Sequence, residues 1–498
     1  MSESAALVAK PEVLNLENGI RVTLKANSLV VKDKVLAKGN RTRICGLAIG
    51  SMPSEITISY YNVLWASVSD NRLRINYAVE SSKNNVKVSR LTYTLGDVSP
   101  ATAEEWAEVL LVRAYGKSPR RKYAKIFINP NAGPGHATRL WQREAQPLFE
   151  AAHIALDIVT TTGRGEAEAM CKILSLDRYD TIVVCSGDGL VYEVFNGLGK
   201  RPDARRALQT MAVAHIPCGS GNAMSINVNG SHRVGPAALA VIKGVRTSID
   251  LMSITQGPRR TLSFLSQAVG IIAEADLGTE NMRWMGAKRF DVGVVTRILS
   301  QKCYPCDIAV KVEIEDRAQV KAHYRRNREG HGESKEDQAG TPATADDSGP
   351  GLPPLRYGTV NDEIPDDWER LSYPKLGNFY CGNMAWMAPN ANFFPAACAD
   401  DGLMDMVIND GNIPAMKYAD LMLSVEKGKF FDNPLISYRK VAAYRFTPKD
   451  QETGLIDIDG EEIPFEPFQV EIHRGLGTVL TKSGRYEAPG PSGWQKAT

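Results

Sequence analysis

The chain has 498 residues, with 59 Lys and Arg against 57 Asp and Glu, which gives a formal net charge of +2 at pH 7. This near-balance argues against a protein whose main work is to neutralise nucleic-acid phosphates, so no nucleic-acid partner is expected. With 43% hydrophobic residues, the composition excludes a chain that is disordered throughout, and the length predicts two to four domains. No run approaches the roughly 18 apolar residues of a membrane-spanning helix, so we expect peripheral membrane contact at most.

The first residues, MSESAALVAKPEVLNLENG, lack the basic start and apolar stretch of a secretory signal, and we expect a cytoplasmic protein. The eight cysteines are scattered along the chain, which favours reduced thiols over a disulfide framework. Cys303 and Cys306 have CxxC spacing, but no second pair accompanies them. A loop pair is therefore favoured over a tetrahedral zinc site.

Residues 1–115 are predicted to form a mostly β region. Short runs such as VTLKANSLVV and VKVSRLTYTL read as strands of an antiparallel unit. The following segment, 101–116, places Trp106 at helical spacing with other apolar residues, and Thr102 and Glu105 form a plausible capping pair. An antiparallel β unit followed by one helix that contains a Trp resembles a pleckstrin-homology-like module. A generic β domain is the alternative. Acidic residues interleave with the basic ones here, so phosphoinositide binding is not predicted.

After a polar linker at 116–123, strands and amphipathic helices alternate over residues 122–255. This alternation predicts a parallel α/β sheet whose loops gather at the carboxyl ends of the strands. Strand patterns dominate over residues 256–485 and predict a second, mostly β domain. Within it, the polar segment rich in Gly, Pro and Ser at about 322–367 is predicted to be a disordered insertion.

The first of four glycine-rich segments is NPNAGPG, residues 129–135, between an apolar strand and a helix. Glycines at such a place expose backbone N–H groups that bind anions. This segment lacks the GKS or GKT sequence of a P-loop. A GKS does occur at residues 116–118, but Leu111 stands where a P-loop needs its first Gly. No stretch matches GxGxxG with its distal acid, which argues against a dinucleotide dehydrogenase.

The second segment, SGDGLVYEVFNGL, begins at Ser186 and also leads from a strand into a helix. Asp188 stands between Gly187 and Gly189, so its carboxylate would project from a tight turn, as a general base must. Glu193 and Asn196 follow on the helix. Taken alone, a GDG sequence is more often a turn former or helix cap.

The third segment, IPCGSGNA, places Ser220 between Gly219 and Gly221 at another strand end. Because parallel strands end at the same edge of a sheet, we expect these first three loops to lie on one rim. The fourth segment is DIDGE, residues 457–461. Alone, it reads as a hairpin turn.

Taken in order, these blocks and the segment FLSQAVGIIAEADLGTENMRWMGAKRF resemble the diacylglycerol-kinase-like lipid kinases over residues 122–480. Within that group the chain resembles the sphingosine, or long-chain base, kinases. The resemblance implies a phosphofructokinase-like α/β nucleotide domain followed by a β-sandwich-like lipid-binding domain. The first loop departs from the family, with Pro134 and His136 where a Gly-Lys-Gly sequence is commoner.

The resemblance assigns the catalytic base to Asp188 and recognition of the substrate to Asp276. It assigns contacts with ATP to residues in every glycine-rich block and in two further segments: Asn129, Pro130, Asn131, Thr161, Thr162, Gly163, Arg164, Gly165, Ser186, Gly187, Glu193, Gly219, Ser220, Gly221, Arg283, Arg289, Asp459, Gly460 and Glu461. The cofactor Mg²⁺ is expected to come with ATP, supported through water by Asp459 or Glu461 and without a direct protein ligand.

The implied reaction transfers the γ-phosphoryl group of ATP to the primary hydroxyl of a sphingoid base. A carboxylate at Asp276 would pair with the free ammonium of that base, although Glu274 occupies the position of the acid in ceramide kinases. Ceramide or diacylglycerol kinase activity is the alternative, and a catalytically silent membrane adaptor is the alternative from another class. NAD kinases share the GDG loop, but the long apolar block favours a lipid acceptor. The apolar residues of that block are read either as an acyl pocket or as core: Phe264, Leu265, Val269, Ile271 and Ile272.

Overall fold

The computed structural model describes residues 12–33, 43–44, 47–48, 55–80, 85–279, 302–329, 349–491 and 493–494. The chain divides into two compact units. The first comprises Met1–Lys122 with Gln142–Ala155, and the second comprises Tyr123–Trp141 with Leu156–Thr498.

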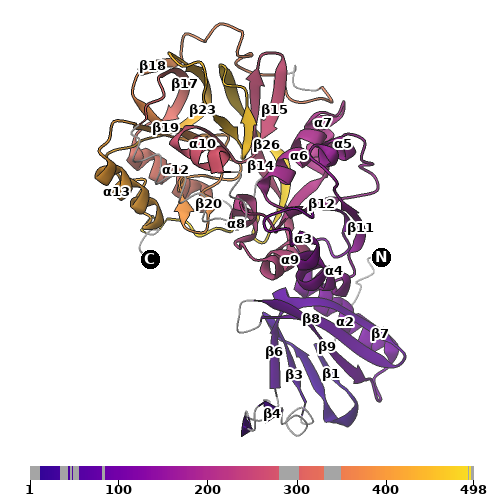
Figure 1. Cartoon of the computed structure of the whole chain (residues 1–498). Coiled ribbons are helices and arrows are strands. Elements are labelled where there is room, and N and C mark those ends of the chain that lie inside the picture. The colour runs from indigo at the N-terminus through magenta and orange to yellow at the C-terminus, as the bar shows by residue number, and fades with distance from the viewer. Residues whose placement is uncertain are drawn as a thin grey trace, which may run out of the picture. The chain divides into compact units, whose positions relative to one another are not determined.

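The first unit is mostly β, as the sequence predicts. It contains a four-stranded antiparallel sheet, a three-stranded antiparallel sheet, a short hairpin and two helices (Figure 1). The four-stranded sheet consists of β1 (Val13–Asn15), β2 (Arg21–Leu24), β3 (Ser28–Lys32) and β6 (Glu55–Ser59). The three-stranded sheet consists of β7 (Val63–Ser69), β8 (Arg72–Glu80) and β9 (Val86–Thr94), and the hairpin pairs β4 (Arg43–Ile44) with β5 (Leu47–Ala48). The helices are α2 (Pro100–Tyr115) and α4 (Gln146–Ala151).

Helix α2 begins one residue earlier than predicted, and its cap differs. The hydroxyl of Ser99 accepts the backbone N–H of Thr102 at 3.1 Å, and Pro100 occupies the first turn, where its missing N–H costs nothing. The predicted pairing of Thr102 with Glu105 is therefore wrong. Trp106 is fully buried, as its helical spacing with other apolar residues predicts.

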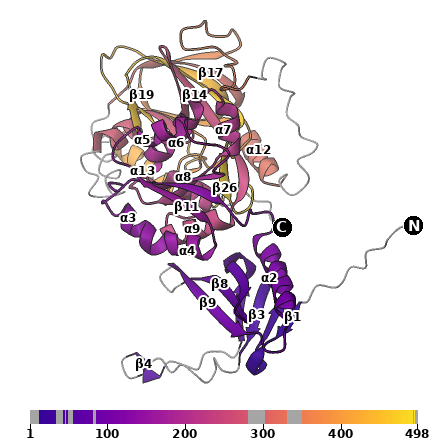
Figure 2. The ribbon, with the colours of Figure 1, turned by 90° about the vertical axis from the view of Figure 1, so that its right-hand side faces the viewer.

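The second unit is built on a sheet whose first part is parallel. Strand β12 lies between β10 and β13 and pairs with both in parallel. All six residues of β12 are buried, which explains its unbroken apolar run. The strands of this part are β10 (Tyr123–Ile128), β11 (Ala155–Thr160), β12 (Thr181–Ser186) and β13 (Ala212–Pro217), and its helices are α3 (Ala137–Leu140), α5 (Glu166–Lys172), α6 (Asp188–Gly199), α7 (Ala204–Thr210), α8 (Ala223–Asn229) and α9 (Val234–Lys243) (Figure 2).

The predicted domains at 122–255 and 256–485 share one continuous sheet. Strand β26 (Phe468–Thr481) pairs in parallel with β13 and antiparallel with β14 (Val245–Gln256), so the end of the chain joins the two parts. The remaining elements are β15 (Arg259–Ser263), β16 (Ser266–Gly270), α10 (Ile271–Asp276), β17 (Cys306–Ile314), α12 (Arg317–Glu329), β18 (Glu369–Tyr373), β19 (Leu376–Gly382), β20 (Trp386–Ala388), β21 (Ala391–Asn392), β22 (Met404–Asp410), α13 (Ala415–Glu426), β23 (Ser437–Pro448), β24 (Ile456–Ile458) and β25 (Glu461–Ile463).

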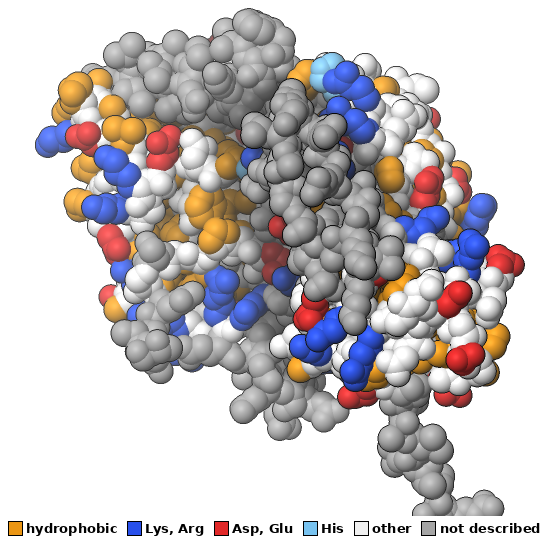
Figure 3. Space-filling model, turned by 90° about the horizontal axis from the view of Figure 1, so that it is seen from below, with side chains coloured by type: hydrophobic (Ala, Val, Ile, Leu, Met, Phe, Trp, Pro, Cys, Tyr) orange, Lys and Arg blue, Asp and Glu red, His pale blue; other side chains and the backbone are white. Residues whose placement is uncertain are grey.

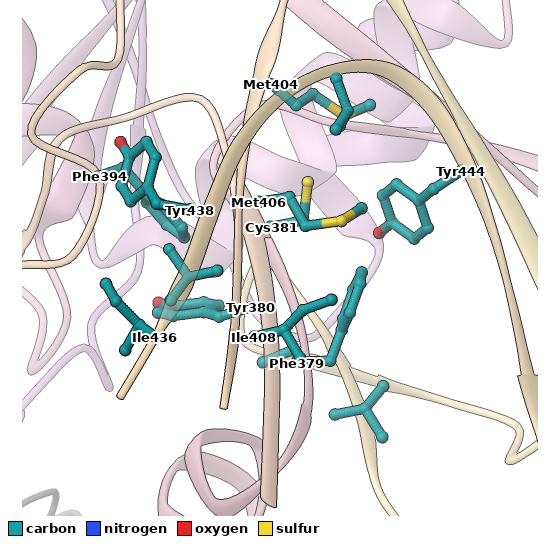
Figure 4. Close-up of a cluster of buried hydrophobic side chains, with 14 of the residues drawn as sticks. Phe379, Tyr380, Cys381, Phe394, Met404, Met406, Ile408, Ile436, Tyr438 and Tyr444 are labelled. Carbon is teal, nitrogen blue, oxygen red and sulfur yellow. The ribbon is translucent and has the colours of Figure 1, made fainter. Parts of the chain in front are cut away.

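The antiparallel part encloses an aromatic core, which Figure 4 shows in close-up. The ring centroids of Tyr380 and Phe394 lie 4.7 Å apart, and those of Phe379 and Tyr444 lie 5.0 Å apart. Such tilted pairs add to the free energy of burial. Four of the five candidate acyl-pocket residues are buried in hydrophobic cores: Phe264, Leu265, Val269 and Ile271. Ile272 is partly exposed. Residues that line an acyl pocket would be buried as well, so both readings stay predictions.

The prediction of a disordered insertion over residues 322–367 is wrong for part of that range. Helix α12 extends through Glu329, and residues 349–367 are described. In that second stretch, the backbone N–H groups of Arg356 and Tyr357 each donate to the carboxylate of Glu471 at 3.1 Å. Only residues 330–348 of the predicted insertion lie outside the described part of the chain.

Among the helices that the structure describes, none is long and apolar enough to cross a membrane. On the face drawn in Figure 3, described basic and acidic side chains are interspersed, in keeping with the net charge of +2.

Candidate functional site

Three of the four glycine-rich loops lie together, because they follow adjacent parallel strands. The N–H of Asn129 donates to the carbonyl of Cys185 at 3.2 Å, and the N–H of Cys218 donates to that of Ser186 at 2.9 Å. The second and third loops touch through their backbones. A Cβ atom added to Gly219 would lie only 2.3 Å from the Cα atom of Gly187, so no side chain fits there. The prediction of a common rim is confirmed for these loops.

Asp188 is the first residue of α6, and its side chain reaches the third loop. Its Oδ2 accepts the N–H of Ala223 at 2.7 Å, and its Oδ1 accepts the N–H of Met224 at 3.0 Å. Asp188 thus caps α8 rather than its own helix. The residue is only 8% exposed, but each carboxylate oxygen can accept a second hydrogen bond. A Cβ atom at Gly221 would lie 3.3 Å from Oδ2, so glycine at 221 leaves this oxygen without a side chain beside it.

The turn at 161–165 and the helix α6 are joined by Glu193. Its Oε1 accepts the N–H of Gly165 at 2.9 Å, whereas its buried Oε2 has no hydrogen-bond partner among the described residues. The same holds for the buried Oγ of Ser220. Buried polar atoms are rarely left unpaired in a folded protein, so these two atoms indicate the place of a polar ligand.

The first loop is held in a tight turn. The side chain of Asn129 accepts the N–H of Asn131 at 3.0 Å, while Gly133 and Gly135 adopt positive φ angles of 55° and 80°. Only glycine adopts such angles readily. The arrangement presents backbone at this end of β10, as an anion-binding loop requires.

Asp459, in the fourth segment, is a structural anchor. Its carboxylate is 1% exposed and accepts four donors: the Ser263 hydroxyl at 2.6 Å and the N–H groups of Phe264, Leu265 and Ser266 at 2.9, 3.1 and 2.8 Å. Burial raises the pKa of Asp459 to about 6, against the effect of these bonds. Three of these donors share Oδ1 and one bonds Oδ2, so the carboxylate holds residues 263–266 in place, and the water-mediated role beside Mg²⁺ stays a prediction.

Glu461 brings the fourth segment to the second loop and to the 161–165 turn. It forms an ion pair with Arg164 of the 161–165 turn. A Cβ atom at Gly189 would lie 3.1 Å from its Oε1, so Glu461 packs directly against the GDG sequence. Residues almost 300 positions apart therefore meet beside Asp188.

Asp276 ends α10 and lies next to the same turn, half-buried. Its Oδ2 is 4.0 Å from the position of a Cβ atom at Gly460, and its carboxyl group hydrogen-bonds that of Asp457. Burial, followed by the charge of Asp276, raises the pKa of Asp457 well above its ordinary value. Glu274, by contrast, forms a 2.6 Å ion pair with Lys302. The structure thus distinguishes the two acids of this block, with Asp276 beside the DGE turn.

Two residues of the site were missed by the sequence analysis. Asp457 was read only as part of a turn, and His215, on β13, was not considered. The ring of His215 is fully buried, with Nδ1 3.7 Å from Oδ1 of Asp188. A signal was available for His215: it is a polar residue in the otherwise apolar strand AVAHIP.

Two predicted nucleotide ligands cannot be placed. Arg283 and Arg289 lie outside the described residues. Among the residues that are described, no group of three or more His, Cys, Asp or Glu side chains could hold a metal ion. Cys303 and Cys306 are free thiols, and Cys306 is the buried first residue of β17, so the prediction of a loop pair is wrong for it.

Comparison with known proteins gives two domain matches. The model of the diacylglycerol kinase catalytic domain matches residues 123–254, and a domain of unknown function matches residues 12–116. A crystal structure from Bacillus anthracis str. Sterne, named as a diacylglycerol kinase, superposes with a TM-score of 0.51 at 18% identity, covering 73% of this chain and 96% of that one. This likeness shows a shared fold.

Similar sequences carry more specific names. Sphingoid long chain base kinase 4 of Schizosaccharomyces pombe is 32% identical over 93% of this chain and 96% of its own length. Sphingoid long chain base kinase 5 of Saccharomyces cerevisiae is 36% identical over 77% of this chain, and the match spans 62% of that longer protein. Sphingosine kinase 1 of Homo sapiens is 28% identical over 75% of this chain and 94% of its own.

Proposed function

This chain belongs to the family of sphingoid long-chain base kinases, and from that premise we propose that it transfers the γ-phosphoryl group of ATP to the primary hydroxyl of a sphingosine-type base, with Asp188 as the general base. The observation that carries the proposal is the meeting of the second, third and fourth glycine-rich segments with the 161–165 turn beside the carboxylate of Asp188. Asp188 bonds the third loop, and Glu461 packs against Gly189 while pairing with Arg164. Catalysis of phosphoryl transfer consists mainly of such positioning and charge stabilisation.

In the proposed reaction, the substrate hydroxyl oxygen forms a bond to the γ-phosphorus of ATP while the bond from that phosphorus to the β–γ bridging oxygen breaks. ADP leaves with the electron pair of the broken bond. The hydroxyl proton passes to Asp188, because a neutral alcohol is a poor nucleophile. The half-open side of Asp188 at Gly221 is the approach that we assign to the alcohol.

We assign the phosphates of ATP to the backbone N–H groups of the glycine-rich loops. The unpaired Oε2 of Glu193 and Oγ of Ser220 support a polar ligand between the 161–165 turn and the third loop. Mg²⁺, brought with the nucleotide, would neutralise charge on the phosphates. Glu461 is the acid of the DGE turn that fits a water-mediated role beside it, since its side chain is 21% exposed.

The experiment that tests this function uses the purified full chain with labelled ATP and Mg²⁺. Sphingosine, ceramide and diacylglycerol are offered in separate mixed micelles, and label in the lipid fraction is measured. We expect transfer to sphingosine in preference to the other two. Label on none of the three would refute a lipid kinase and favour a catalytically silent adaptor, whereas preferential label on ceramide or diacylglycerol would overturn the substrate.

Asp276 is assigned to the ammonium of the base, and its replacement should change selectivity. We expect Asp276→Asn to lower the ratio of sphingosine to ceramide efficiency by about tenfold or more, because a charge-assisted hydrogen bond contributes about 1.5–3 kcal/mol. The measurement is kcat/KM on both lipids, with the loss for sphingosine expected in KM.

Glu274→Gln is the matched control, since Glu274 is an acid of the same helix that pairs with Lys302. The ratio of sphingosine to ceramide efficiency in Glu274→Gln should equal that of the unchanged enzyme. An equal loss on both lipids in Asp276→Asn would contradict the assignment to the ammonium.

Two finer features also remain proposals. Peripheral association with a membrane follows from the apolar nature of the substrate, which partitions into bilayers. A pleckstrin-homology-like fold for the first unit is supported by its two antiparallel sheets followed by α2.

A further inference from the structure

A buried imidazole lies behind the proposed base. The Nε2 atom of His215 lies 2.9 Å from the carbonyl oxygen of Ser186. Since a carbonyl oxygen only accepts, Nε2 must carry a proton. The other ring nitrogen, Nδ1, has no hydrogen-bond partner in the part of the chain that the structure describes, and it lies 3.7 Å from Oδ1 of Asp188. The side chain is 0% exposed, so water cannot satisfy Nδ1 from the surface.

The ring is expected to be neutral at pH 7. Burial lowers the pKa of His215, and this effect exceeds the opposite influence of the Asp188 carboxylate. In the described part of the chain, Asp188 of α6 is the charged group facing the ring. Strand β12 contributes the Ser186 carbonyl, and Asn229 of α8 donates to the backbone carbonyl of His215 at 2.8 Å. A neutral ring with a proton on Nε2 directs the lone pair of Nδ1 toward Asp188.

We propose that His215 is a positioning residue that raises the proton affinity of Asp188. The two N–H groups at the start of α8 hold the carboxylate in place through hydrogen bonds. The lone pair of Nδ1 repels the ionised carboxylate but not the neutral acid.

This inference rests on the proposed role of Asp188 and adds a partner to it. Asp188 accepts the hydroxyl proton, and His215 neither gains nor loses one during transfer. Its contribution is larger in the transition state than in the ground state, because negative charge leaves the carboxylate as the proton arrives. Only a differential interaction of this kind raises kcat.

The test variant is His215→Gln, whose amide can still donate to Ser186 but offers no lone pair in the position of Nδ1. With saturating ATP and sphingosine, we expect kcat at pH 7 to fall about tenfold, while the KM for ATP stays unchanged. The acid limb of the kcat profile should move about one pH unit lower, because one unit of pKa corresponds to a tenfold change in proton binding. A fall in kcat with an unmoved acid limb would overturn the proposal.

A double-mutant cycle separates this role from a structural one. If His215 acts through Asp188, His215→Gln should leave the residual rate of Asp188→Asn unchanged, because there is no carboxylate left to tune. An equal tenfold loss in both backgrounds would show that the ring acts independently of Asp188, contrary to the proposal.

His473→Gln is the matched control for loss of a buried imidazole. His473 is 7% exposed, and its Nε2 lies 2.9 Å from the Ser253 hydroxyl, on strands that do not carry Asp188. The acid limb of the kcat profile of His473→Gln should stay at the pH found for the unchanged enzyme. If His215→Gln shows no cooperative unfolding transition, His215→Met provides the same comparison. The proposed function fails if the unchanged enzyme does not phosphorylate sphingosine, whereas this inference fails in an active enzyme whose acid limb does not respond to His215.

Discussion

Asp188→Asn is expected to lower kcat for sphingosine by on the order of 10²–10⁴ while ATP still binds. An amide cannot take the hydroxyl proton at neutral pH, so the variant loses the base but keeps the shape of the side chain. ATP binding should survive because the backbone N–H groups of the glycine-rich loops are unchanged. The measurements are kcat by transfer of labelled phosphate and Kd for ATP by calorimetry.

The structure predicts a second consequence of the same change. The carboxylate accepts two backbone N–H groups, from Ala223 and Met224, but an amide can accept through its oxygen alone. One buried donor is left unpaired, which costs about 1–3 kcal/mol of unfolding free energy. The variant should therefore melt at a lower temperature yet remain folded at the assay temperature, which thermal unfolding checks.

Asp177→Asn is a suitable control, because Asp177 is an exposed carboxylate whose 2.9 Å ion pair with Arg206 lies on the surface. Its rate and its melting temperature should match those of the unchanged enzyme. A near-normal rate in Asp188→Asn would show that the proton goes elsewhere and would remove Asp188 from the role of base.

The rim of loops was predictable because the directions of parallel strands determine it. Apolar runs followed by glycine-rich loops that begin at Asn129, Gly187 and Gly219 are local signals, and a parallel sheet makes these loops neighbours without any knowledge of long-range contacts. The same argument explains why the Ser186 and Cys218 backbones meet.

The hydrogen bonds of individual carboxylates were not predictable in this way. Asp188, Asp459 and Glu461 all lie in glycine-containing turns, yet the first caps a different helix, the second anchors a buried turn and the third pairs with Arg164. Their partners come from segments 35 to 297 positions away. Sequence spacing contains no information about such pairs, because the packing of the whole sheet decides them.

The domain boundaries show a related effect. The sequence pattern changes near residue 255 from alternating helices and strands to mostly strands, which predicts a domain boundary. The secondary structure of the chain changes there in the same way. However, β26 returns from the end of the chain to pair with both β13 and β14. The two predicted domains are thus joined by backbone hydrogen bonds, which a local composition shift does not reveal.

Gly219→Ala should reduce kcat/KM for ATP and lipid together by about 10²-fold, although it adds only one methyl group. The new Cβ atom would lie 2.3 Å from the Cα atom and 2.5 Å from the N atom of Gly187, and backbone atoms cannot move aside as a flexible side chain can. The second and third loops must therefore separate. Misplacement of catalytic groups by about 1 Å can cost about 10²-fold in rate.

Gly163→Ala is the matched comparison, because it makes the same chemical change in another predicted ATP-binding turn. Nothing lies within 4 Å of its added Cβ atom, and its φ angle is outside the left-handed region, so we expect less than a threefold change in kcat/KM. Overpacking at Gly219 should also lower the free energy of unfolding by about 1–3 kcal/mol, measured by urea denaturation. If Gly219→Ala and Gly163→Ala both change kcat/KM by less than threefold, the Gly187–Gly219 contact does not position Asp188. Contacts other than those of the third loop would then hold the base in place.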